Sequence, residues 1–404
     1  MSRKLCTGAA LICAALVFLL ALPVAAASHA PQEDGRAERP EVDPYTEGDA
    51  KAMERLGIQR FGPFRFGDGR TTEVIATQAG GVPFLWIETA HFQLGCSLEP
   101  ISMPEDPAAK KRLQAELKEL SKRLPNVPRR IKKIDSWLLL HLYAARLERL
   151  FEAFVTELQL EDLAAADPYL GSGGPFCILL TEKKSTFSRY TLEACGSASE
   201  STQRFYFDKP AQQLFYGAAF EALQGDLHQD EGLHFAMVHG VTKVLAESVR
   251  GYGGVLPTWL SAGLAHYFAR NLVSDEILLY TTPRGESGRG KDDSNFAVKV
   301  RGRVSNKVYP TFEEMEAWTD PGAMRFADHM ITWSKIDFML RADKGSRAHA
   351  FLWAISEPIA WDIKDRAQVL LDQTHTALLD IAGGDLMDLD QAWADWVLDE
   401  YPKR

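Results

Sequence analysis

Two neighbouring helical segments, at about 230–250 and 257–272, constrain the fold of this chain more than any other feature. Apolar residues recur at helical spacing in each of them, which predicts one buried face per helix. The apolar positions are Met237, Val241, Val244 and Leu245 in the first segment, and Leu260, Leu264, Tyr267 and Phe268 in the second. Pro257 suits the first turn of the second helix. We therefore expect a packed helix pair joined by the glycine-rich link 251–254.

Each predicted helix also carries a second face. His239 and Lys243 stand four residues apart, as do Ala262 and His266, so each pair shares one side of its helix. At about 100° per residue, these sides lie roughly opposite the apolar faces. The four residues are therefore expected to line a cleft beside the helix pair.

The second segment resembles the gluzincin metallopeptidases, in particular the peptidase MA-like domains of exported bacterial proteins. In that family one helix carries the HExxH motif, and the next begins with a Leu-Pro-x-Trp-Leu-x-Glu-Gly-Leu-Ala-x-Tyr-Phe type of signature. The residues here that match the second signature are Leu256, Pro257, Trp259, Leu260, Gly263, Leu264, Ala265, Tyr267 and Phe268. The resemblance covers about 84–400 in outline and is specific only around 237–268.

The functional positions of the family are the ones that differ. The resemblance places the first zinc histidine at His239, the general base at Gly240, the second histidine at Lys243 and the third ligand at Ala262. Glycine cannot accept a proton, alanine has no lone pair for a metal, and a lysine ammonium repels Zn²⁺. The resemblance therefore implies a metallopeptidase fold without catalytic residues, metal or cofactor, that is, a pseudopeptidase.

A rebuilt zinc site is the alternative, and it would make the chain an active zinc-dependent peptidase. His239 and His266 could share it with a distant ligand, but His234 lies about 140° around the helix from His239 and cannot easily join them. We expect the remaining patterned histidines, His91, His141 and His329, to be structural.

Lys243 has two possible environments. Its ammonium could stand where the family's zinc would sit, with a neutral His239 accepting a hydrogen bond and Ala262 leaving room. Alternatively, it simply extends to solvent, as most lysines do.

The N-terminus has the pattern of a cleavable signal peptide over residues 1–27. Arg3 and Lys4 precede an apolar run from Ala9 to Leu22, Pro23 ends the run, and Ala25 to Ala27 offer small residues for cleavage. Cleavage after Ala30 and an uncleaved membrane anchor are the alternatives. We expect a secreted or periplasmic protein with no integral membrane segment once the signal is removed.

Charge and cysteines narrow the expected partners and the redox chemistry. A net charge of −10 argues against non-specific nucleic-acid binding, and the basic stretch 110–133 is best explained as the solvated face of a helix at about 107–124. The remaining partner is an unidentified peptide or protein.

Cys96, Cys177 and Cys195 remain in the mature chain, and export favours a Cys177–Cys195 disulfide, although connectivity cannot be deduced from sequence.

The order of the predicted elements indicates an α+β fold: a small mixed sheet, the gluzincin-like helix pair and a helical C-terminal region. After the signal peptide we expect a flexible tail (28–60), N-terminal strands with the basic helix (61–130), a peptidase-like α+β domain (131–275) and the helical region (276–404). Within these ranges we expect a helix at about 131–160. The expected strands are Thr71 to Thr77, Phe84 to Leu98, Phe176 to Leu180, Arg204 to Phe207 and Gln213 to Tyr216.

Overall fold

The computed structural model describes residues 42–277 and 295–403, apart from Pro125, Arg129, Tyr252, Gly253 and Trp361. The predicted signal peptide at 1–27 and the predicted tail up to residue 41 lie outside the described residues. Residues 40–404 form one compact unit.

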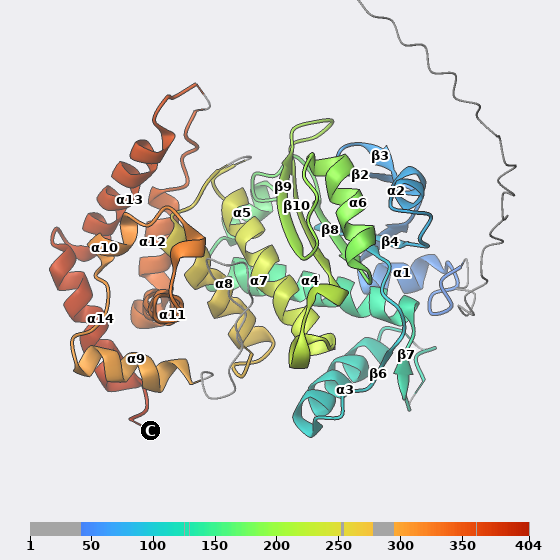
Figure 1. Cartoon of the computed structure of the whole chain (residues 1–404), viewed down its shortest axis with the longest axis horizontal. Coiled ribbons are helices and arrows are strands. Elements are labelled where there is room, and N and C mark those ends of the chain that lie inside the picture. Colours follow the sequence, from blue (N-terminus) through green and yellow to red (C-terminus); the bar gives the residue numbers. More distant parts are fainter. Residues whose placement is uncertain are drawn as a thin grey trace, which may run out of the picture. The chain divides into compact units, whose positions relative to one another are not determined.

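A six-stranded mixed sheet lies at the centre of this unit (Figure 1). The strands, in spatial order, are β1 (Ile58–Phe61), β4 (Leu85–Thr89), β5 (Phe92–Cys96), β8 (Phe176–Thr181), β10 (Gln213–Ala219) and β9 (Thr202–Phe207). The central strands β5, β8 and β10 are parallel, and β1, β4 and β9 pair antiparallel to their neighbours. The predicted strands at Phe176, Arg204 and Gln213 are confirmed, and the predicted 84–98 strand is the β4–β5 hairpin.

The sheet is covered on both faces because its central strands are apolar throughout, as parallel strands usually are. Side chains alternate between the two faces along a strand. On β8, Cys177 and Leu179 join the cluster under α2 (Thr72–Gln78) and α6 (Lys184–Cys195). Ile178 and Leu180 face α4 (Ser136–Glu157) and α7 (Asp230–Ser248), as does Tyr216 of β10.

The helix pair is confirmed, and so is the α+β class. Helix α8 (Thr258–Leu272) packs between α7 and α11 (Phe326–Arg341). The remaining C-terminal helices are α9 (Phe296–Ser305), α10 (Phe312–Glu316), α12 (Ser346–Ala354), α13 (Arg366–Ala382) and α14 (Leu386–Glu400). Figure 1 shows them on the side of α8 away from the sheet.

Two parts of the fold differ from the sequence prediction. The segment 71–77, predicted as a strand, contains most of helix α2, because its buried residues Thr72, Ile75 and Ala79 follow helical rather than alternating spacing. Helix α6 was not predicted, although Phe187, Tyr190 and Thr191 form a buried stripe on it.

The second half of the predicted tail is ordered and carries α1 (Ala50–Leu56) and β1. Asp43 is only 2% exposed, and it accepts hydrogen bonds from Tyr45 N and Thr46 Oγ1 and contacts His141 Nε2 at 3.0 Å. A buried carboxylate with several partners explains why a segment of polar composition packs against the core.

The expected boundaries at residues 130 and 275 do not divide the described chain into separate bodies. Strands β1, β4 and β5 belong to the same sheet as β8, and α8 packs against α11. Two short antiparallel strand pairs and one short helix also belong to the described part of the chain. The pairs are β2 (Arg65–Phe66) with β3 (Arg70–Thr71) and β6 (Ile101–Ser102) with β7 (Lys133–Ile134), and the helix is α5 (Glu161–Ala166).

The basic segment forms helix α3 (Pro107–Ser121), as predicted. Its leucines, Leu113, Leu117 and Leu120, are buried, whereas Lys110, Lys111 and Lys118 are exposed. Among the described residues, no helix combines the length and the apolar character needed to cross a bilayer.

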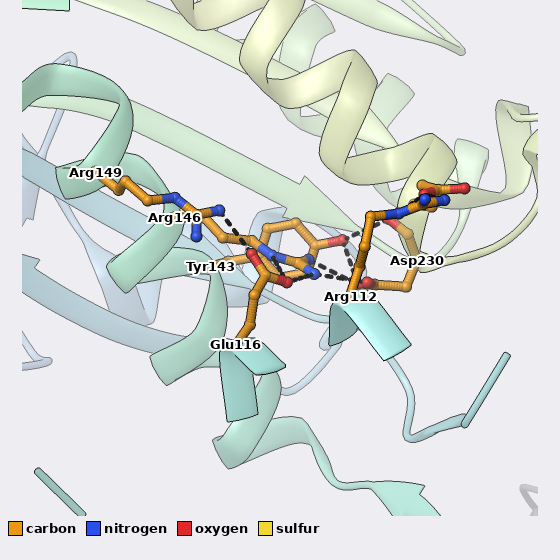
Figure 2. A network of polar contacts seen from close by, with 7 residues as sticks. Arg112, Glu116, Tyr143, Arg146, Arg149 and Asp230 are labelled. Carbon is orange, nitrogen blue, oxygen red and sulfur yellow. Dashed lines mark hydrogen bonds and ion pairs between the residues drawn. The ribbon is translucent and has the colours of Figure 1, made fainter. Parts of the chain in front are cut away.

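A buried ionic network fixes the first turn of α7 against α3 and α4 (Figure 2). The guanidinium of Arg146 on α4 donates to both carboxylate oxygens of Asp230, at 2.8 and 2.7 Å, and to Glu116 of α3 at 2.6 Å. Tyr143 donates to the same Asp230 at 3.0 Å. Because every charge here has a partner, the network orients the helix that carries His239.

Candidate functional site

Three histidines from three different helices meet beside the sheet, and we call them the histidine cluster: His239 of α7, His266 of α8 and His329 of α11. The ring centroids of His239 and His266 are 4.9 Å apart, and those of His266 and His329 are 5.0 Å apart. His266 and His329 are buried, whereas His239 is partly exposed. His239 and His266, both predicted to line a cleft, thus lie side by side, and His329, expected to be structural, completes the cluster.

The cluster is uncharged near neutral pH. Burial lowers the pKa of His239 and of His266 well below the usual value, and nearby positive charges lower both further. The pKa of His329 falls to about 4, chiefly through burial and then through Lys243. Nε2 of His266 lies 3.0 Å from Nδ1 of His329, so one neutral ring donates to the other.

Lys243 stands one turn beyond His239 on α7 and is partly exposed. Burial lowers its pKa to about 8, Arg204 adds to the decrease, and Glu247 opposes it. Its charge affects the pKa of all three histidines. No hydrogen bond from its Nζ occurs within the described part of the chain, so its role as a zinc substitute stays a prediction.

Gly240, to which the resemblance assigns the general base, lies directly against an aromatic ring. A Cβ at this position would be 2.0 Å from Cε2 of Tyr216, far inside van der Waals contact. The Tyr216 hydroxyl donates to the carbonyl of Ala236 at 2.8 Å, which fixes the ring beneath α7. A glutamate could not occupy position 240 without displacing Tyr216 from the core.

Ala262, at the third-ligand position, is 4% exposed and one turn before His266 on α8. Its methyl group offers no lone pair to a metal. The four predicted cleft residues thus contribute two imidazoles, one ammonium and one methyl group.

A second set of polar residues, which the sequence reasoning missed, follows Lys243 along α7. Glu247 is four residues beyond Lys243, forms an ion pair with Arg204 and accepts a hydrogen bond from Tyr206 at 2.6 Å. Arg204 and Tyr206 alternate on edge strand β9 and so share one face of it. The spacing of His239, Lys243 and Glu247 is a signal that could have revealed Glu247.

The residues present do not fit a zinc ion as the family binds it. Among the described residues, no three His, Cys, Asp or Glu side chains come together in a metal-ligand arrangement. His266 and His329 are engaged with each other, and the charge of Lys243 opposes a divalent cation nearby.

His234 belongs to a different environment, consistent with its predicted position on another side of the helix. It is 4% exposed, and burial followed by the charge of Arg146 lowers its pKa well below the usual value. The charge of Glu116 opposes this decrease, so His234 responds to the charges of the ionic network and not to those of the histidine cluster.

The thiols of Cys177 and Cys195 are free in this structure, on the α6 side of the sheet. Burial raises the pKa of each to about 12, which keeps both in the unreactive thiol form. Their disulfide stays a prediction, which peptide mapping without reduction decides.

A relationship to known proteins would be recognised by two features, the helix pair α7–α8 and the histidine cluster that this pair forms with α11. The resemblance to gluzincin metallopeptidases depends on residues 237–268, where the second-helix signature is complete except at Ala262. Comparisons of the chain with family models, with curated proteins and with solved structures found no match.

Proposed function

We propose that this chain is an exported metallopeptidase-like protein without catalytic activity, a pseudopeptidase, whose cleft binds a peptide or protein partner or serves as a scaffold. The observation that carries the proposal is the contact between Gly240 and Tyr216. The position of the general base has no side chain and no room for one. Without a base to activate water, hydrolysis by the family's mechanism has no route.

The electrostatics of the cleft support the same proposal. The resemblance assigns the second zinc histidine to position 243, where the chain has a lysine, and the positive charge of Arg204 acts on the same Lys243. Positive groups beside neutral imidazoles favour a partner that brings acidic or carbonyl acceptors to the cleft. Export is supported by the signal-peptide pattern at residues 1–27.

Elemental analysis of the purified chain, with assays on casein and on a peptide library, tests the loss of catalysis. We expect no stoichiometric zinc and no cleavage. About one zinc per chain that disappears in His239→Ala, but persists in a variant of the exposed His228, would overturn the proposal.

An active zinc peptidase with a rebuilt site is the second candidate, favoured by the convergence of His239, His266 and His329. It requires the three rings to turn toward one metal and Lys243 to lose its proton. Zinc that is lost in both His266→Ala and His329→Ala, together with peptide cleavage, would select it.

A further inference from the structure

A cavity lies at the turn between α7 and α8, bounded on its other sides by α10 and α13. Its volume is about 440 Å³, within the range of small-molecule sites. Its walls are mostly apolar and include Leu256, Trp318, Ile359, Leu370 and Leu371. The residues of the histidine cluster do not line it, so it is a separate site.

Arg250 supplies a buried positive charge to this cavity. The residue is only 1% exposed, and its Nη2 donates to Glu357 O at 3.1 Å and to Gln373 Oε1 at 2.9 Å. Its Nε and Nη1 are buried and meet no acceptor in the described part of the chain. Nη2 thus fixes the guanidinium, while the donors on Nε and Nη1 have no acceptor among the described residues. Burying unpaired donors costs free energy unless an acceptor occupies the cavity.

The chain is arranged to leave Arg250 in this position. A Cβ on Gly254 would lie 2.4 Å from Cβ of Arg250, so the turn passes directly over the arginine. Burial and the charge of Arg366 lower the pKa of Arg250 to about 10, which leaves it cationic at neutral pH.

A helix N-terminus adds to the positive potential of the cavity. Pro257 and Thr258, where α8 begins, belong to the cavity wall, and no side chain caps the first turn of this helix. The unbonded amides of a helix N-terminus attract anions. Arg250 and the start of α8 therefore favour the same kind of ligand.

The acidic residues of the cavity limit the charge of that ligand. Asp365 is occupied as the cap of α13, where it accepts from Gln368 N at 3.1 Å. Glu316 pairs with His375 at 2.9 Å through one oxygen, and its other oxygen is buried without a partner among the described residues. Burial raises the pKa of Glu316. Arg366, which also lines the cavity, donates to the carbonyl of Ile359 at 2.7 Å. A negative group is therefore expected at Arg250 and not beside Glu316, and one carboxylate on an otherwise apolar molecule meets both conditions.

We propose that this cavity binds an apolar molecule bearing one carboxylate, with the carboxylate on Arg250 and the apolar part between α10 and α13. Two sources offer this chemistry: a medium-chain carboxylic acid and the apolar C-terminal residue of a peptide. The charge-assisted bonds to the guanidinium supply the preference for the acid, and the apolar walls supply the remaining affinity.

Calorimetric titration of the purified chain with octanoate and with octanamide tests the proposal. We expect one octanoate per chain and a Kd for octanamide about tenfold or more higher, because the amide lacks the charge. Arg250→Met should abolish the difference, whereas the same change at the partly exposed Arg303, which lies outside the cavity wall, should preserve it.

A second variant keeps the test decisive if Arg250→Met does not fold. Leu371→Trp, on the partly exposed wall of α13, fills the cavity and should abolish octanoate binding. Unchanged octanoate binding by this variant, or equal affinity of wild type for acid and amide, would overturn the proposal.

A short acetylated peptide ending in leucine, titrated as its free acid and as its amide, distinguishes the two sources. Tighter binding of the peptide acid than of octanoate assigns the cavity to peptide C-termini, and the reverse assigns it to small carboxylic acids. Failure of both acids to bind means that Arg250 has only a structural role.

Discussion

At the scale of single residues, the Gly240–Tyr216 contact determines which side chains helix α7 accepts at position 240. The alternation of β10 directs Tyr216 toward α7, and the hydrogen bond to Ala236 O fixes the ring at the point where α7 passes closest. A glycine at position 240 is therefore a packing requirement. A glutamate introduced there would have to displace Tyr216.

Gly240→Ala should therefore destabilise the protein although alanine is the better helix former. The new methyl group meets Tyr216 at 2.0 Å, and overpacking of this kind costs about 1–3 kcal/mol, more than the roughly 1 kcal/mol gained in helix propensity. Urea unfolding measures the change. Gly302→Ala in α9, where a Cβ meets nothing within 4 Å, is the matched control and should be neutral or stabilising.

Lys243 gives a pH-dependent prediction whose sign follows from its lowered pKa of about 8. Between about pH 8 and the ordinary lysine value of 10.5, the unfolded chain holds a proton that the folded chain has released. The free energy of unfolding therefore rises with pH across this window. Lys243→Met should remove that rise and be the more stable protein at pH 7, by on the order of 1–3 kcal/mol.

Urea unfolding of wild type and Lys243→Met at pH 7 and at pH 10.5 measures this difference. Lys335, whose pKa burial also lowers to about 8, contributes equally to both proteins and cancels. The difference in free energy of unfolding between the two proteins should therefore change with pH. If it stays constant, Lys243 is solvated, and Arg204, Glu247 and the histidine cluster do not affect its charge.

At the scale of elements, α7 is held at its first turn by charge and along its length by the sheet. Arg146 lies between Glu116 and Asp230 in Figure 2, so helices α3, α4 and α7 meet at one guanidinium. Glu116 and Asp230 are both largely buried, and neither could keep its charge cheaply without Arg146. The pKa of Glu116 is accordingly held well below its usual value: burial opposes this decrease, and Arg146 causes most of it.

Arg146→Met should lower the free energy of unfolding by about 3–5 kcal/mol, because Asp230 and Glu116 both lose their buried guanidinium and keep only Tyr143 and Arg149, respectively, as partners. Chemical unfolding is the measurement. Arg112→Met provides the comparison, since Arg112 forms an exposed ion pair with Glu231 and should cost about 1 kcal/mol or less. Adding Asp230→Asn to Arg146→Met should recover part of the loss. No recovery would place the effect in packing rather than in charge.

The elements with strong local patterns were predictable, and those fixed by tertiary contacts were not. The apolar run at 176–180 and the helical stripes of α7 and α8 carry their structure in their own spacing. The approach of His239 to His266 followed from the same helical geometry. His329 lies 63 residues from His266 and arrives through the packing of α11 on α8, which no local pattern records. Tyr216 reaches Gly240 only because β10 pairs with β8 beneath α7.

At the scale of the whole molecule, α8 connects the sheet and α7 to the C-terminal helices. Its Gly263 allows α11 to approach closely: a Cβ there would lie 2.5 Å from Ile336 Cγ1 and 2.7 Å from the carbonyl of Thr332. A backbone carbonyl within a helix cannot move aside as a flexible side chain can. The packing of α8 on α11 is therefore sensitive to one methyl group.

Gly263→Ala should lower the stability of the described unit as a whole. We expect a loss of about 1–3 kcal/mol from overpacking, reduced by up to about 1 kcal/mol of helix propensity. Far-ultraviolet circular dichroism follows all helices, and tryptophan fluorescence is weighted towards the C-terminal region, because seven of the nine tryptophans follow Pro257 in the sequence, among them Trp259 on α8, Trp333 on α11 and Trp393 on α14. Because residues 40–404 form one compact unit, the two signals should shift to lower urea concentration together.

If the fluorescence transition moved alone, or if the circular dichroism transition split in two, the C-terminal helices would be an independently folding part. Gly302→Ala, which lies in the same helical region but meets no neighbour, should leave the two transitions coincident without lowering them.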